Sequence, residues 1–198
     1  MGNGEAVVGN KSIVNIRHEW AGFYRRYFQM VVDFSDVVIP DDPGGFSRVI
    51  FIPKGLTIAA VVNAMRTKSI TIVISDDADG ALKGHNVREA DHNYAVCFRD
   101  RQEADEELEN CSFNKLKADG INSVTLMERL VYGFKFWSEN EDGQHLDVFN
   151  VTVCAGSQYA DGGVPDVHWN IDYRKVYVSW CHPDDARVHL RSRQAVSN

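Results

Sequence analysis

The sequence lacks any long apolar run, and this absence excludes a whole class of proteins. Charges or glycines interrupt every apolar stretch within about eight residues, whereas a helix that crosses a membrane needs roughly 20. The N-terminus also lacks the basic and apolar regions of a secretory signal peptide. We therefore expect a soluble, cytoplasmic protein that has no membrane partner.

Cysteine is scarce and its spacing is not that of a metal ligand set. The four cysteines, Cys97, Cys111, Cys154 and Cys181, include no CxxC pair. Possible zinc ligands are concentrated in the C-terminal third, but their spacing matches no zinc finger or ribbon: His145, Asp147, Cys154, His168, Cys181 and His182. Free thiols are expected, because disulfides need an oxidising compartment.

An acidic loop at 76–80 has the composition of a calcium site but not its register. With Gly80 at the sixth position of an EF-hand loop, Ser75 would be first and Asn86 twelfth. The first acid and the final bidentate glutamate are then both missing. We expect no metal and no cofactor, and we interpret the loop as a solvated turn.

Excess negative charge disfavours nucleic acid as a partner. The formal net charge is −7, which opposes attraction to phosphates. Arg25 with Arg26, and Arg187, Arg191 and Arg193 in the tail, form short basic groups that we assign to the solvated surface. The apolar share of 44% and the charged share of 25% are those of an ordinary globular protein.

Helical periodicity appears at four places. Aromatic residues spaced three and four apart predict a helix over 15–29 with one buried face. Thr57 is a candidate cap for a short helix over 56–65, and Ser112 for a turn over 113–117. Thr125 and Glu128 have the spacing of a capping box, which predicts the longest helix, ending at about residue 138.

Strand patterns fill much of the remainder. A hairpin is predicted from 30–39 and 46–53, and further strands over 69–75, 94–98 and 148–154. A second hairpin joins 164–171 to 175–180 through a turn at 170–174. Turns rather than helices connect these pairs, which favours an α+β fold: a mainly antiparallel sheet packed by two or three helices.

Three segments are expected to lie outside this core. Residues 1–12 have no periodicity and are interpreted as a flexible N-terminal arm. The charged segment 99–110 is expected to be an exposed loop or helix, and 183–198 a helical turn and a tail. The chain shows no repeat and no strong linker, so residues 13–198 are expected to form a single domain.

One candidate chemistry is nucleophilic catalysis. Cys154 ends a predicted strand, His145 stands two residues before Asp147, and His168 follows across the next turn. A thiol beside an imidazole that a carboxylate orients is the arrangement of a Cys-His hydrolase. The sequence does not show whether these side chains meet.

Aromatic and polar residues are concentrated between residues 156 and 184. The candidate ligand-binding residues are Tyr159, Asp161, His168, Trp169, Tyr177 and Trp180. Aromatic faces beside carboxylates and imidazoles suit stacking and directional hydrogen bonds. The alternative is that Trp169 and Trp180 face the core while the polar residues alternate outward.

Several segments resemble an uncharacterised family of bacterial hypothetical proteins. The resemblance runs from Gly22 to the C-terminus and rests on the segments at 32–37, 53–57, 99–108 and 154–165. It implies a bacterial, cytoplasmic setting. Because the family has no known activity, the resemblance assigns no catalytic or binding residue.

Three hypotheses of function follow from these patterns. The first is a non-enzymatic binding or interaction module for a small molecule or a protein, using the surface of residues 156–184. The second is a hydrolase-like enzyme built on Cys154, and we favour it less. The third is the structural subunit of a homo-oligomer.

Overall fold

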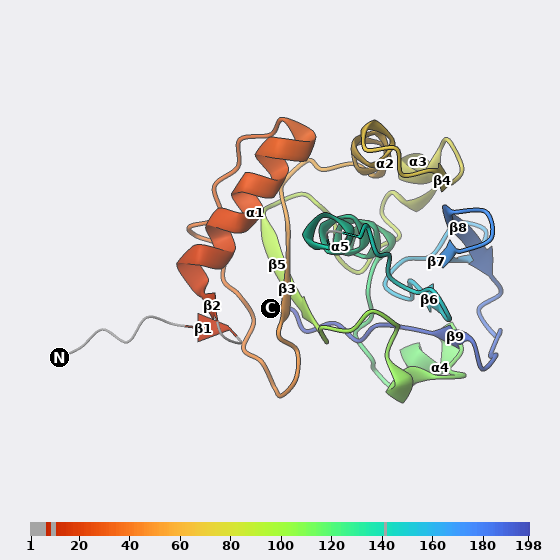
Figure 1. Ribbon diagram of the computed structural model, residues 1–198. Helices are drawn as coiled ribbons and strands as arrows, with labels where there is room; N and C mark the ends of the chain where they lie inside the picture. Colours follow the sequence, from red (N-terminus) through yellow and green to blue (C-terminus); the bar gives the residue numbers. More distant parts are fainter. Residues whose placement is uncertain (1–6, 9–10, 141) are drawn as a thin grey trace.

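Among the residues that the structure describes there are five α-helices, four of them where the sequence predicts periodicity or capping. The computed structural model describes residues 7–8, 11–140 and 142–198 (Figure 1). Its helices are α1 (Ile13–Phe28), α2 (Ile58–Thr67), α3 (Ala78–Leu82), α4 (Phe113–Ala118) and α5 (Leu126–Glu139). The remaining one is α3, which begins inside the acidic segment that was expected to be a turn.

The predicted caps hold the starts of three helices. The Thr57 side chain accepts a hydrogen bond from the Ala60 amide at the start of α2. Ser112 does the same for α4. Thr125 and Glu128 complete a reciprocal capping box at the start of α5, so both side chains satisfy amides that the helix itself leaves free.

Two sheets carry most of the strands. The first pairs β3 (Arg48–Ile52) with β5 (Tyr94–Phe98) antiparallel. The second has the order β4-β8-β7-β6-β9, with β4 (Ile72–Val73), β6 (Val151–Val153), β7 (Val164–Asn170), β8 (Lys175–Cys181) and β9 (Leu190–Arg191). Its central pairs are antiparallel, whereas β4 and β9 join parallel, so this sheet is mixed.

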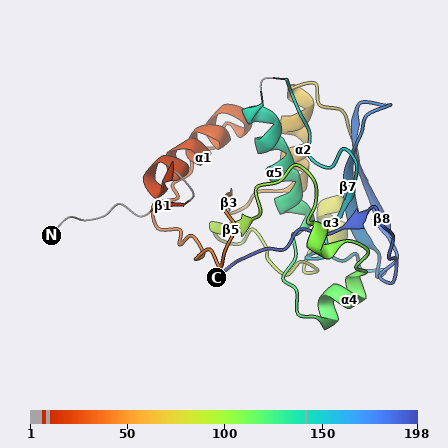
Figure 2. The same cartoon turned by 60° about the horizontal axis from the view of Figure 1, so that its bottom comes forward.

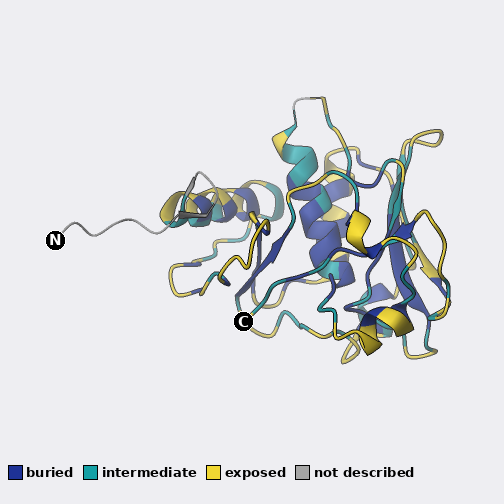
Figure 3. Ribbon diagram, turned by 90° about the horizontal axis from the view of Figure 1, so that it is seen from below, coloured by how far each residue is buried: buried dark blue, intermediate teal, exposed yellow. Residues whose placement is uncertain are grey.

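Helix α5 lies between the two sheets and is the centre of the core. It contacts β3 on one side and β7 on the other, with α2 beside it (Figures 1 and 2). Most of its residues are coloured as buried in Figure 3, and Leu126, Leu130 and Phe134 are almost fully inaccessible. The α+β fold class is confirmed.

The first predicted hairpin is wrong. Residues 30–39 form turns and irregular backbone, and β3 pairs instead with β5, more than 40 residues later. Segment 30–39 packs side chains such as Phe34 and Val37 into the core without joining a sheet. The strand expected over 69–75 also shrinks to the two residues of β4.

The segments expected at the surface contribute buried residues. Within 99–110, Ala104, Asp105 and Leu108 are buried. Within the expected tail, β9 adds an edge to the mixed sheet, and Arg193 is fully buried rather than solvated. The tail therefore belongs to the core.

The N-terminal segment is described only in part. Backbone pairing joins β1 (Val7–Val8) to β2 (Lys11–Ser12), and α1 follows directly. The flexible arm predicted for residues 1–12 otherwise falls outside the described residues. Among the described helices, none has the length and apolar character to cross a membrane.

Candidate functional site

The pleat of the β7–β8 hairpin separates the residues that were expected to form one surface. In the antiparallel register, His168 pairs with Tyr177 and Trp169 pairs with Val176. Side chains alternate across a strand, so His168 and Tyr177 share one face. Trp169 and Trp180 belong to the other.

The inner face of the hairpin packs toward α5. Trp169 stacks on His145 with ring centroids 3.6 Å apart and an interplanar angle of 8°, and it contacts the main core cluster. Burial and the nearby Arg129 lower the pKa of His145 to about 4, so its imidazole is neutral near pH 7. Trp169 therefore packs with the core, as the alternative interpretation expected.

Trp180 differs from Trp169 although it belongs to the same face. Its side chain is 65% exposed. A Cβ added at Gly163 would lie 3.5 Å from Trp180 and 3.6 Å from Tyr159, so these rings flank that glycine. Asp161 holds the preceding turn by accepting the Gly163 amide at 3.0 Å.

The outer face carries an aromatic cluster in which Tyr173 is exposed and His168 and Tyr177 are half-buried. His168 stacks on Tyr177 with centroids 5.6 Å apart, and Tyr177 meets Tyr173 edge to face at 6.5 Å. Burial lowers the pKa of His168, so this imidazole too is neutral near pH 7. Tyr173, in the hairpin turn, is 66% exposed.

Two exposed residues outside the predicted list lie near the same end of the sheet. Val151 pairs with Leu190 in parallel register, and its amide donates to the His189 carbonyl. Phe149 and Val188 stand two residues before that pair, in the neighbouring loops that lead into β6 and β9. They are 84% and 68% exposed. We call Phe149, His168, Tyr173, Tyr177 and Val188 the outer aromatic face.

The carboxylate of Glu103 fixes the loop that presents Phe149. It accepts the backbone amides of Val148, Phe149 and Asn150 at 3.0 to 3.3 Å, and also the Asn150 side chain. Charge-assisted hydrogen bonds of this kind are strong. The exposed phenyl ring is therefore carried by a loop with a fixed backbone.

Helix α4 covers only one end of the outer face. Phe113 packs there in a small second core cluster with Val153, Val164, Cys181 and Leu190. Figure 2 shows β7 and β8 at the margin of the molecule, with α2 and α5 on the inner side and α4 below. Of the described helices, only α4 reaches this side of the sheet, and it leaves the outer aromatic face uncovered.

Asp166 lies on the same face, nearer the covered end. Burial, with a smaller contribution from Asp185, raises its pKa to about 6. No group of three or more histidines, cysteines or carboxylates is assembled as a metal site within the described chain. The charge of Asp166 thus changes near pH 6 without a ligand cluster around it among the described residues.

The proposed nucleophile Cys154 is on the inner side and fully inaccessible. Burial raises the pKa of its thiol well above the usual value, which opposes the thiolate that nucleophilic catalysis needs. Its hydrogen bond goes to the Thr152 carbonyl, with 3.9 Å between Sγ and O. Among the described side chains, no histidine is hydrogen-bonded to it.

Asp147 is part of a buried ion-pair network instead of a catalytic set. Its carboxylate binds Arg129 at 2.7 Å and Arg193 at 2.6 Å, and it accepts a short hydrogen bond from Thr152. Burial opposes ionisation, but the two guanidinium groups outweigh it and lower the pKa of Asp147. Cys154, His145 and Asp147 therefore each have a different partner in the structure.

A cavity of about 340 Å³ adjoins the start of the predicted binding segment. It is lined by loops around His85, Asn122, Gly156 and Gln158 and by the side of α4. The Ser157 hydroxyl at its wall donates to Asn86 at 2.6 Å and accepts the Leu126 amide at 2.9 Å. This hydroxyl connects its own loop to the Asn86 loop and to the start of α5, and both bonds are within the protein.

Comparison with known proteins does not indicate a function, so the function is inferred from the geometry alone. No family model, no curated protein and no solved structure matches the chain. The resemblance to a bacterial family stays a prediction.

Proposed function

We propose that this protein is a non-enzymatic interaction module that binds a protein partner through its outer aromatic face. The observation that carries the proposal is the exposure of Phe149, whose phenyl ring is 84% accessible on a loop clamped by Glu103. An exposed apolar ring costs solubility and adds nothing to the core. A fixed backbone also lowers the entropy lost on binding.

The composition of the face supports a protein partner. Phe149 and Val188 supply apolar area, while Tyr173 and Tyr177 add rings with a polar end. Aromatic side chains are enriched at the centres of protein interfaces, where a few of them supply most of the affinity. A small molecule is the less favoured ligand of this face, because the cavities of about 340 and 520 Å³ in the protein are lined by other residues.

The hydrolase-like alternative is less well supported. It needs an accessible thiolate, and Cys154 has neither exposure nor a low pKa. The homo-oligomer hypothesis uses the same surface as our proposal, with a second copy of the chain as the partner.

The proposal is tested by photo-crosslinking in cells. A benzophenone amino acid is placed at Phe149 or at Tyr173, and in control variants at Val38 or Val87, which are exposed elsewhere. We expect one adduct of the same mass from both positions on the outer face. The control positions should yield little of it.

The identity of the adduct distinguishes the hypotheses. A different protein in the adduct supports the interaction module, provided that the purified partner binds the unmodified protein. An adduct of twice the chain mass supports the homo-oligomer instead. Equal adducts from all four positions, or none from the outer face, would contradict the proposal.

A further inference from the structure

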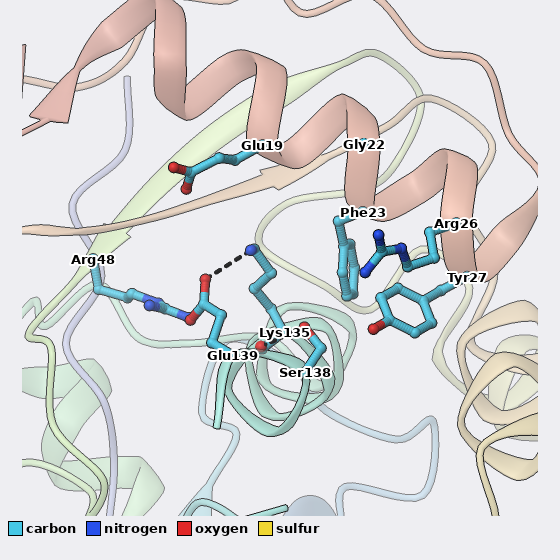
Figure 4. A pocket seen from close by; sticks show the side chains of 9 residues that line it. All are labelled: Glu19, Gly22, Phe23, Arg26, Tyr27, Arg48, Lys135, Ser138 and Glu139. Carbon is cyan, nitrogen blue, oxygen red and sulfur yellow. Dashed lines mark hydrogen bonds and ion pairs between the residues drawn. The ribbon is translucent and has the colours of Figure 1, made fainter. Parts of the chain in front are cut away.

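A groove of about 520 Å³ separates the last turns of α1 and α5, away from the outer aromatic face. Figure 4 shows Arg26 and Tyr27 reaching toward it from α1, and Lys135, Ser138 and Glu139 from α5. Arg48, at the start of β3, closes one end. This volume is within the range of small-molecule sites.

Two cations are held in the floor of this groove. Lys135 is almost fully buried and lies over the rings of Trp20 and Phe23, with Nζ 5.5 and 5.6 Å from their centroids. Glu139 bridges Lys135 at 2.7 Å and Arg48 at 2.5 Å. Lys135 has three donor hydrogens, and among the described residues Glu139 is its one ion-pair partner.

Arg48 also has spare donor capacity. Its Nε is buried and has no hydrogen-bond partner among the described residues. A buried polar hydrogen without a partner costs free energy that a bound acceptor would recover. Burial opposes the ionisation of Glu139, but Arg48 and Lys135 outweigh it and lower the pKa of this residue. The single negative charge of Glu139 thus faces the two positive charges of Arg48 and Lys135.

Arg26 adds a third cation at the rim. Its side chain is exposed, and no described residue pairs with its guanidinium group. Tyr27 and Phe23 form an aromatic wall beside it (Figure 4). A guanidinium group next to an aromatic surface suits a ligand with an oxyanion at one end and a planar apolar body.

We infer that this groove binds a small organic oxyanion, a phosphate or carboxylate attached to a planar group. The oxyanion accepts hydrogen bonds from Arg26 and Lys135, and the planar group lies against Tyr27. Arg48 pairs with one oxygen of Glu139 while the other oxygen contacts the Lys135 ammonium, which leaves further donor hydrogens of Lys135 for the ligand. This inference does not depend on the function proposed for the outer aromatic face.

Two carboxylates line the groove, Glu19 and Glu139, and Glu139 is paired with Lys135 and Arg48. Glu19 stands on α1 one turn before Phe23 and faces the same groove (Figure 4). Replacing it by glutamine removes a repulsive charge without removing bulk. The variant Glu19→Gln should therefore bind an anion more tightly, whereas a site built for a cation would lose affinity.

The test is calorimetric titration of the full chain with phenyl phosphate, benzoate and inorganic phosphate. We expect phenyl phosphate or benzoate to bind more tightly than inorganic phosphate, because only they contact the aromatic wall. Arg26→Ala should weaken this binding at least about tenfold, the usual cost of losing a charged hydrogen bond. Arg25→Ala is the matched control, since it removes the same charge from the neighbouring exposed position and should act within about twofold.

Thermal unfolding of each variant shows whether its fold is intact. If phenyl phosphate binds best, inorganic phosphate competes and benzoate does not, the oxyanion is a phosphate; the reverse pattern assigns a carboxylate. Absence of binding by all three probes would overturn the inference. So would equal losses in Arg25→Ala and Arg26→Ala, because they would indicate a diffuse charge effect and no defined site.

Discussion

Burial decides which of the four cysteines can react. Cys97, Cys154 and Cys181 are buried, and burial raises the pKa of Cys97 and Cys181 to about 12. Cys111 is half-buried. In native protein we expect an aromatic disulfide reagent to label Cys111 first, with the other three reacting only as the chain opens. Mass spectrometry after brief labelling measures the order, and fastest labelling at Cys154 would instead revive the hydrolase-like hypothesis.

Asp166 should make stability depend on pH. Its folded-state pKa is raised to about 6, so folding favours the protonated carboxyl group. The ionised group therefore destabilises the fold progressively as the pH rises from about 4 through 6, by up to about 3 kcal/mol at pH 7.5. We expect Asp166→Asn to increase the free energy of unfolding at pH 7.5 and to change it little at pH 4.

Urea unfolding at the two pH values measures this difference. Asp172→Asn is the control, because Asp172 is exposed in the hairpin turn. An effect of Asp166→Asn that is the same at both pH values would show that a lost packing contact, and not ionisation, is responsible.

Single residues also show the limit of the sequence as a source of candidate sites. His168 and Tyr177 both stand in the list of candidate ligand-binding residues, and the hairpin predicted from the sequence brings their rings together. It did not suggest Phe149 and Val188, whose proximity depends on β6 pairing with β9, nearly 40 residues later.

At the scale of elements, local signals were sufficient for helices and insufficient for strand pairing. The cap of α2 at Thr57 and the capping box of α5 act within four residues, so the sequence contains the whole interaction. The partner of β3 is β5, and choosing it requires tertiary packing that no local pattern encodes. The hairpin proposed for 30–39 and 46–53 failed for that reason.

Gly156 lets its loop approach the backbone of Ser123 and Val124 more closely than any other residue would allow. A Cβ at this position would lie 2.5 Å from the Ser123 carbonyl oxygen and 2.9 Å from that of Val124. Both contacts are to backbone, which cannot move aside easily. We expect Gly156→Ala to lower the free energy of unfolding by about 2 to 3 kcal/mol.

Urea denaturation of Gly156→Ala measures that loss against Gly22→Ala. Gly22 lies in α1, and a Cβ there would meet no atom within 4 Å. The control should be neutral or gain up to about 1 kcal/mol from helix propensity. Equal behaviour of the two variants would mean that the loop of Gly156 relaxes freely.

At the scale of the whole molecule, the C-terminal segment connects the two sheets. β9 pairs with β6 in the mixed sheet, and Val196 exchanges backbone hydrogen bonds with Cys97 of β5. Between these points Arg193 donates to Asp147 and to the carbonyls of Arg101 and Gln102. The charged composition of 183–198 predicted a solvated tail. Composition alone does not show that Arg193 pairs with the buried carboxylate of Asp147.

Arg193→Met should therefore destabilise the whole fold. It leaves the Asp147 carboxylate with one cation and removes the donors to the carbonyls of Arg101 and Gln102, which costs about 3 to 5 kcal/mol. Arg187→Met, in the same segment but exposed, should change stability by less than about 0.5 kcal/mol. Chemical denaturation compares the two, and a loss below about 1 kcal/mol in Arg193→Met would contradict a central role for this network.

The most direct test of the account is the affinity of the crosslinked partner, once purified, for three forms of the protein. Calorimetry compares the wild type, Phe149→Ser on the outer aromatic face and Val38→Ser, which is exposed elsewhere. If Phe149 is an anchor, its replacement weakens binding at least about thirtyfold while Val38→Ser binds as the wild type does. Unchanged affinity in Phe149→Ser would contradict the assignment of this face as the interaction surface.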